Sequence, residues 1–288
     1  MVRRSMVILG VLATGLTGCP PEEPPAPAET WEAIAPETPR PSPSEADGDV
    51  DYAYMVRMRM VTISVPLGAA SGSEHLWSYL HSESIEAART GSLGRNGLRV
   101  GLVSRENWPD VAAVLDELTG TARKTTVMTC LPGQAVSVAL KRDQPMQTVF
   151  VFEKDRTLSG QDYPPGDNLL SFFCSMNMND PSEVTLTAMP QIRTTNRKPE
   201  IVKRGDMARI VSRATYFDFE AAAFRAALAS RDVLIVGPGQ ASRRSSSLAH
   251  RFLLRQSDGV TYETILVVIP RIFAVPRDRR GSVPAPQG

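Results

Sequence analysis

Between residues 121 and 275 the sequence consists of short stretches rich in Val, Ile, Thr and Phe, separated by Gly, Pro, Asn and Asp. β-Branched and aromatic residues suit the half-buried surface of a sheet, and the separating residues favour turns. Among the breaks, LPGQ, NDPS and QSDGV have the composition of hairpin turns. One stretch differs, because FEAAAFRAALAS (219–230) has apolar residues four apart and predicts a helix. We therefore predict an antiparallel, β-rich domain over residues 121–275.

The most apolar stretch of this domain is YETILVVIPRIF (262–273). Its alternating positions from Ile265 to Pro270 are apolar on both sides of a strand, so we expect both faces to be covered. If the domain associates through a sheet edge, this strand is the one that we expect to matter most. Arg271, at its end, is then the candidate contact residue.

Residues 51–120 show a mixed pattern. Near their start, the apolar positions are even-numbered from Val56 to Met60 and odd-numbered from Val61 to Val65, which predicts a strand with either a bulge or burial on both faces.

Two helix signals and a second strand follow this first strand. Ser73 can cap a short helix, the turn signal at Asn96-Gly97 precedes an apolar strand over 98–103, and residues 107–120 have apolar side chains at helical spacing. The predicted fold class is α+β, with a small β-α-β-α module (51–120) followed by the larger antiparallel β-rich domain.

The chain begins with positive charge and a short apolar run. Arg3 and Arg4 precede the run over residues 6–17, which is too short to span a bilayer because a span takes about 20 apolar residues. The run ends in LTGC, which resembles the lipobox of bacterial lipoproteins. The resemblance implies that residues 1–18 are a signal peptide and that the sulfur of Cys19 carries a diacylglycerol. An ordinary secretory signal peptide with a chance cysteine is the alternative.

The segment after this cysteine is rich in proline and acidic residues and poor in apolar ones. Such a composition cannot bury enough surface to fold, so we expect residues 19–50 to be a disordered, lipid-anchored tether. The resemblance to bacterial lipoproteins also implies the outer membrane in a cell with two membranes, because residue 20 is proline rather than the aspartate that marks inner-membrane retention in that family. The Pro- and Gly-punctuated end, 276–288, is predicted to be a disordered tail.

The charge of the chain limits its expected partners, and its cysteine content limits the expected disulfides. The 32 Lys and Arg nearly balance the 31 Asp and Glu, for a net charge of +1, and no basic run suggests a nucleic-acid partner. Besides the lipobox cysteine there are only Cys130 and Cys174. In an oxidising compartment these two form a disulfide or remain as two buried thiols, and both alternatives stay open.

No catalytic or metal-binding motif is present. His75 and His81 are six residues apart, which places them on different faces of a helix, and no histidine lies near either cysteine in the sequence. The stretch SRRSSS (242–247) is an anion-binding candidate, for which a mobile hairpin tip is the favoured alternative. We therefore predict no enzyme activity, no metal and no cofactor.

Four stretches of the β-rich part occur in the order found in the core of bacterial secretins, which it resembles. They are TTVMTCLPGQAVSVAL, SEVTLTAMPQIRT, FRAALASRDVLIVGPG and YETILVVIPRIF. The sequence departs from the family at Pro238, which replaces the second glycine of a Gly-Gly turn, and no counterpart of a "VPLLGDIPILG" segment lies between 239 and 262. The resemblance implies a shortened, secretin-like domain that does not form a gated pore alone.

These features predict a non-catalytic envelope lipoprotein on the periplasmic face of the outer membrane or the cell surface. It would act through an envelope protein partner or self-association, as a component of secretion or of an envelope complex. The alternative is a periplasmic lipoprotein that binds a small molecule or carbohydrate, with Trp77, Trp108 and Tyr163 as stacking residues.

Overall fold

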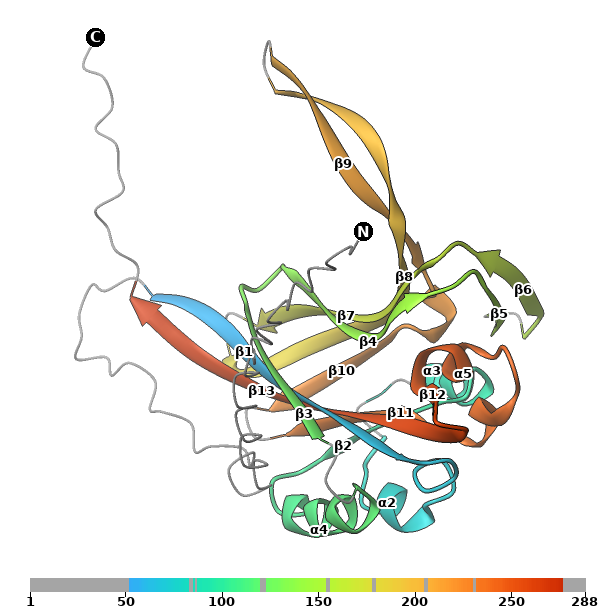
Figure 1. Cartoon of the computed structure of the whole chain (residues 1–288). Coiled ribbons are helices and arrows are strands. Elements are labelled where there is room, and N and C mark those ends of the chain that lie inside the picture. The colour runs from blue at the N-terminus through green and yellow to red at the C-terminus, as the bar shows by residue number, and fades with distance from the viewer. Residues whose placement is uncertain are drawn as a thin grey trace, which may run out of the picture.

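The computed structural model describes residues 52–82, 85, 87–119, 123–153, 156–177, 180–204, 207–229 and 232–276. Two large antiparallel sheets lie face to face, with short helices against one outer face and at one end, and a third sheet has two strands (Figure 1). The predicted α+β class with a dominant antiparallel β part is confirmed. No helix of the described ranges is long and apolar enough to cross a membrane.

The strands, in chain order, are β1 (Tyr52–Pro66), β2 (Leu98–Val103), β3 (Arg123–Cys130), β4 (Ala135–Gln144), β5 (Gln147–Phe152), β6 (Leu158–Tyr163), β7 (Gly166–Asn177), β8 (Asp180–Arg204), β9 (Met207–Asp218), β10 (Phe224–Ala229), β11 (Val233–Pro238), β12 (Leu254–Ser257) and β13 (Val260–Pro276). The helices are α2 (Glu74–Ser78), α3 (Ala87–Arg95), α4 (Trp108–Thr119) and α5 (Leu248–Leu253), with 3₁₀ turns η1 (Glu220–Ala222) and η2 (Gln240–Arg243).

The six-stranded sheet has the order β2-β11-β13-β1-β3, with β12 also paired to β13. It takes strands from both sides of residue 120, because β1 and β2 precede this residue and the other four strands follow it. The boundary that we placed there falls between α4 and β3, beside residues 120–122, which lie outside the described ones. The two described strands before residue 120, β1 and β2, therefore do not pair with each other but with strands that follow this residue.

Both faces of the six-stranded sheet are buried at its centre. On β13, Ile265 and Val267 pack with α2 and α4 in one hydrophobic cluster, while Leu266 and Val268 belong to the cluster shared with the five-stranded sheet. The prediction that both faces of this strand are covered is confirmed.

The apolar face of β1 changes because both faces of the six-stranded sheet are buried. Val56, Met58 and Met60 point into the cluster between the sheets, and Val61, Ile63 and Val65 point into the cluster under the helices. The pairing of β1 with β13 runs without a register shift. The strand is therefore buried on opposite faces in its two halves and contains no bulge against β13.

The five-stranded sheet has the order β10-β8-β7-β4, with β9 also paired to β8. β10 alternates between buried and exposed side chains, with Phe224 buried, Arg225 exposed and Ala226 buried, whereas residues 166–172 of β7 are all buried. The helix predicted over 219–230 is wrong, since this stretch forms η1 and then β10. Alternation at every second residue fits the register with β8, and this pairing overrides the helix propensity of an alanine-rich stretch.

Three predicted turns have different outcomes. QSDGV is a two-residue hairpin turn between β12 and β13, with Asp258 and Gly259 at positive φ. The first residue of NDPS lies outside the described residues, and Asp180 begins β8. LPGQ is not a hairpin turn, because β3 joins the six-stranded sheet and β4 the five-stranded one. The stretch HRFLLRQS (250–257), which lies within the predicted β-rich domain, is only partly a strand, since α5 occupies its first half.

Candidate interaction surface

The β8–β9 hairpin extends well beyond the sheet to which it belongs (Figure 1). β8 pairs with β7 as far as Thr194, whereas from Arg197 to Arg204 it pairs only with β9. The outer part of the hairpin is thus a two-stranded ribbon, in which each strand has one edge without a strand partner among the described residues.

A β-bulge separates this ribbon from the sheet. Arg193 pairs with Tyr216 but Arg197 pairs with Ala214, so three residues of β8 lie opposite Thr215 alone. The amide of Thr215 donates to Oγ1 of Thr194 at 3.1 Å, which holds the bulge. Extra residues in one strand bend it and increase its twist, which turns the ribbon away from the body.

Polar contacts fix the base of the hairpin. Arg193 on β8 binds the carboxylate of Asp167 on β7 at 2.5 Å, and the amide of Asp143 on β4 donates to the same carboxylate at 2.9 Å. Partial burial would raise the pKa of Asp167, but these hydrogen bonds and the nearby guanidinium groups outweigh it and lower that pKa. The carboxylate is therefore ionised near neutral pH and ties three neighbouring strands together where the ribbon leaves them.

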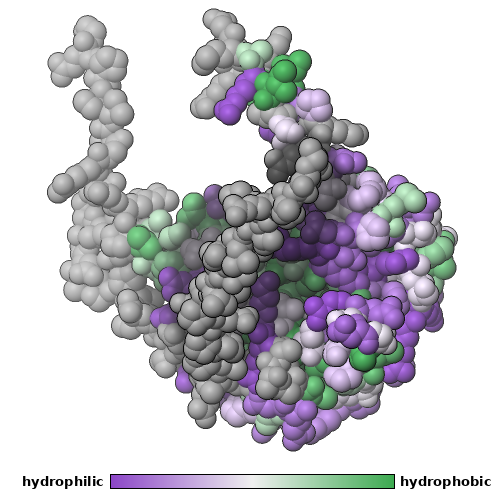
Figure 2. Space-filling view, in the orientation of Figure 1, coloured by the Kyte–Doolittle hydropathy of each residue, from purple (hydrophilic) through white to green (hydrophobic). Residues whose placement is uncertain are grey.

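Apolar side chains are exposed on the ribbon. Ile201 and Ile210 lie directly opposite each other across the two strands, and they are 67% and 70% exposed. Figure 2 shows an apolar group on this projection beside hydrophilic residues. One ion pair, between Arg213 and Glu200 at 3.2 Å, also joins the strands. Two exposed isoleucines beside open strand edges are the features of a surface that another protein chain can cover.

Sequence reasoning placed the candidate contact elsewhere, on the strand that ends at Arg271. β13 is not an edge strand over most of its length, because β1 lies along one side of it and β11 and β12 along the other. Residues 262–263 and 266–268 are therefore paired on both sides, and the prediction that they form a sheet-edge contact is wrong. Arg271 itself is half-buried opposite Arg57, whose guanidinium lies 5.3 Å from the ring centre of Phe273.

The two cysteines come together between the sheets. Cys130 ends β3, Cys174 lies on β7, and their sulfur atoms are 3.1 Å apart in a buried position. The hydrogen bond to Cys130, together with burial, raises the pKa of the Cys174 thiol. The structure contains two thiols here, one from each sheet, and their oxidation to a disulfide stays a prediction.

The aromatic residues proposed for ligand stacking are core residues. Trp77 and Trp108 are 4% and 3% exposed and pack under the six-stranded sheet, while Tyr163 is 9% exposed and contacts Phe217 and Phe219. The indole of Trp77 also donates to the carbonyl of Ala70 at 2.9 Å. None of the three presents a free ring face for a carbohydrate.

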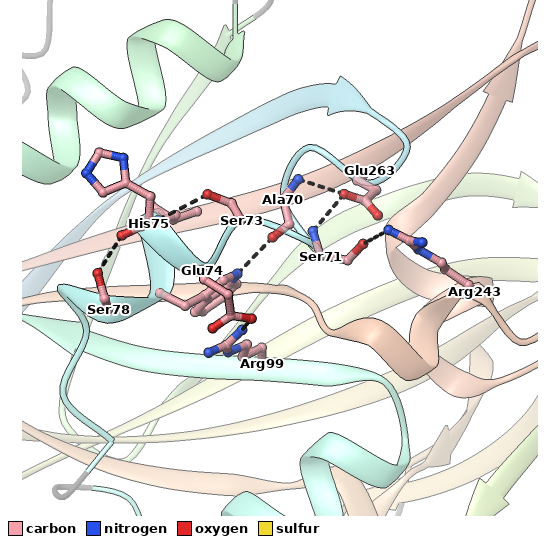
Figure 3. A network of polar contacts seen from close by, with 11 residues as sticks. Ala70, Ser71, Ser73, Glu74, His75, Ser78, Arg99, Arg243 and Glu263 are labelled. Atoms are coloured by element: carbon pink, nitrogen blue, oxygen red, sulfur yellow. Dashed lines mark hydrogen bonds and ion pairs between the residues drawn. The ribbon is translucent and has the colours of Figure 1, made fainter.

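A buried carboxylate organises the turn after β1, and Figure 3 shows its contacts. Glu263 on β13 accepts hydrogen bonds from the amides of Ala70 and Ser71, each at 2.9 Å, and its other oxygen has no partner in the described part of the chain. Ser73 then caps α2, as predicted, by accepting from the amide of Leu76. This network positions α2 against the sheet.

The Ser- and Arg-rich stretch 242–247 is not a hairpin tip. It completes η2 and supplies Ser247 as the cap of α5, while Arg243 reaches Ser71 at 3.4 Å (Figure 3). Arg244 lies 6.0 Å from the ring centre of Phe152. Both arginines thus contact neighbouring segments, which a free loop end would not do.

The remaining candidates do not converge on a reactive centre. His75 contacts Tyr79, His81 bridges to Leu102, and His250 contacts a carbonyl at 3.2 Å. Within the described ranges no three His, Cys, Asp or Glu residues gather as a metal site. Cys19 lies outside the described residues.

Comparisons with known proteins add little to this geometry. No protein-family model matches the sequence, and no curated protein matches it. Solved structures that are similar include the Type IV competence pilus secretin PilQ of V. cholerae (9% identity, 81% of this chain, 63% of that chain, TM-score 0.23). Others are the InvG secretin domain of the Salmonella injectisome (8%, 82%, 68%, 0.21) and a Klebsiella pneumoniae type II outer membrane complex with PulD, PulS and PulC (9%, 80%, 40%, 0.21).

The chain therefore spans less than two thirds of the PilQ chain to which it is similar. Secretins are also the family that the motifs in 182–194 and 262–273 resemble. Likenesses with such TM-scores do not establish a shared fold. The resemblance to the secretin core stays a prediction from the sequence.

Proposed function

We propose that this chain is a non-enzymatic component of a bacterial envelope assembly that contacts a protein partner through the β8–β9 ribbon. The observation that carries the proposal is the cross-strand pair of exposed isoleucines, Ile201 and Ile210, on a ribbon that projects from the body. Large exposed apolar side chains are costly to hydrate, and open strand edges offer unpaired amide and carbonyl groups. A partner that covers both would gain apolar burial and main-chain hydrogen bonds together.

We also propose that the chain is attached to the outer membrane through an acylated Cys19. The charged start, the short apolar run and the LTGC end support this part of the proposal. An extended Pro-rich chain rises about 3 Å per residue, so the tether over 19–50 would allow the folded part to reach partners tens of ångströms from the bilayer.

The test of the interaction is a double variant, Ile201→Ser with Ile210→Ser, in the full chain. Both side chains are mostly exposed, so the melting temperature should not change, whereas the size of the complex in mild detergent should fall. A matched control, Leu158→Ser with Met146→Ser, removes two other exposed apolar side chains and should preserve the complex. An unchanged complex in the ribbon variant, or equal loss in both variants, would refute the proposed surface.

The anchor has a separate test. Cys19→Ser should abolish labelling by a radioactive fatty acid and release the chain from the membrane fraction after a high-salt wash. Retention of the variant in the pellet would refute the anchor and leave the ribbon surface untouched.

A further inference from the structure

A cleft of about 900 Å³ opens between the two sheets, at the side where edge strand β3 of one sheet faces edge strand β4 of the other. β1, β12 and β13 complete its walls, and no described residue of β8 or β9 lines it. The cleft is therefore distinct from the proposed interaction surface.

The inward faces of three neighbouring strands change from apolar to polar as they enter this cleft. On β1, the buried Met58 and Met60 are followed at the same spacing by Thr62 and Ser64, which line the cleft. β3 changes in the same way from Met128 to Thr126 and Lys124, and β13 changes from Leu266 to Thr264. The register of β1 places these changes side by side. One end of the space between the sheets is thus hydrophobic core, and the other end is lined with hydroxyl and basic groups.

All the charged residues that line the cleft are positive. Five of its lining residues are basic and none is acidic: Arg123, Lys124, Lys141, Arg142 and Arg255. Two nearby carboxylates partly balance the charge of these basic residues. Asp116 forms an ion pair with Arg123, and Asp167 is close enough to Arg142 for electrostatic attraction. Lys124, Lys141 and Arg255 form no ion pair with any described residue.

Two of these cations are held in place by neutral groups. Nζ of Lys141 donates to the carbonyl of His250 at 3.2 Å, and the guanidinium of Arg255 donates to Oγ of Ser64 at 3.4 Å. Burial, followed by repulsion from Arg251 and Arg255, lowers the pKa of Lys141 to about 8. A bound anion would offset both effects.

We propose that this cleft binds a phosphate group. Phosphate accepts several charge-assisted hydrogen bonds, and the cleft offers lysine and arginine donors together with the hydroxyls of Thr62, Ser64 and Thr264. The volume exceeds that of one phosphate ion, so the group belongs to a larger molecule, either a soluble phosphorylated compound or a lipid headgroup.

The first experiment titrates the full chain in mild detergent with inorganic pyrophosphate by calorimetry. Arg255→Gln and Lys124→Gln should each weaken binding at least tenfold, and Lys141→Met should weaken it while raising the melting temperature of the free chain. Arg225→Gln is the matched control, because this arginine is exposed on β10 away from the cleft. It removes the same charge and should leave the affinity unchanged.

A second experiment separates the two sources of phosphate. The Cys19→Ser chain, which lacks the proposed anchor, is sedimented with vesicles of phosphatidylglycerol or of phosphatidylcholine. Pyrophosphate binding that depends on Arg255 and Lys124 supports a soluble ligand, and sedimentation with phosphatidylglycerol alone that depends on them supports a lipid headgroup. The proposal is overturned if neither probe binds, or if Arg225→Gln weakens binding as much as the cleft variants do.

Discussion

The two sheets differ in how many of their faces are buried. At the centre of the six-stranded sheet both faces are covered, by helices on one side and by the second sheet on the other, so β11 and residues 263–270 of β13 are buried throughout. In the five-stranded sheet, β10 and residues 183–192 of β8 alternate between buried and more exposed side chains, so this part of the sheet buries one face. A sheet covered on both faces has little surface left for contacts, whereas the half-covered sheet carries the projecting ribbon. The stable part and the contact part of the molecule are thus in different layers.

The strongest test of this difference is a charge placed on either face of β13. Val267→Asp and Val268→Asp each bury an unpaired carboxylate, one under the helices and one between the sheets. Each should destabilise the chain by more than about 4 kcal/mol, seen as loss of the cooperative thermal transition. If either variant melts like the wild type, that face is not buried.

In the five-stranded sheet only one of two neighbours should matter. Leu186 on β8 is fully buried, and Leu186→Ala should cost about 3 kcal/mol of unfolding free energy. The next residue, Thr187, points to the other face, and Thr187→Ala should change stability by less than about 0.5 kcal/mol. Equal effects in urea titrations would contradict the one-faced burial of this sheet.

The buried carboxylate of the six-stranded sheet provides a finer test. Glu263→Ala leaves the amides of Ala70 and Ser71 without their acceptor and should cost about 2 kcal/mol. Glu263→Gln keeps an acceptor oxygen and should cost less. A Gln variant as unstable as the Ala variant would show that charge, and not hydrogen bonding, holds the turn.

The smallest expected effect is a pH dependence at the polar end of the space between the sheets. The pKa of Lys141 is about 8 in the folded chain against an ordinary value of 10.5. Between these values the unfolded chain binds a proton that the folded chain does not, so stability should rise with pH from about 8 to 10.5.

We expect a gain of about 1 kcal/mol for this partly exposed group, measured by urea unfolding in phosphate-free buffer. Lys141→Met should remove that part of the rise. A variant with the same pH profile as the wild type would show that the lysine is not desolvated.

Much of the sheet architecture could be predicted from the sequence, because burial leaves a periodic signal. The change of apolar face between Met60 and Val61 and the continuous run in 262–270 both indicated coverage on two faces. The alanine-rich 219–230 was misjudged because its local propensity suits a helix, and only the neighbouring strand decides the outcome. The pairing of β1 with β13 across the whole chain has no local signal at all.

The candidate surface was harder to predict than the fold. The stretch NRKPEIVKR (196–204) is charged and contains a proline, so it lacked a strand signal. The signal that could have revealed it is Gly205-Asp206, a two-residue turn pair between IVKR and MARIV. The proposed phosphate cleft could not be predicted either, since its basic residues come from three strands, β3, β4 and β12, that only the fold brings together.

Hydrogen exchange of the full chain, measured alone and within detergent-solubilised envelope complexes, tests the claim that the ribbon is the contact surface and β13 is the stable core. In the chain alone, amides of 265–268 should exchange slowest, and outward-facing amides of the ribbon over 200–202 and 208–213 should exchange fast. Within the complex the ribbon amides should become protected while those of β13 stay unchanged. The claim is contradicted if the ribbon exchanges equally fast in both samples, or if it is already as protected as β13 in the chain alone.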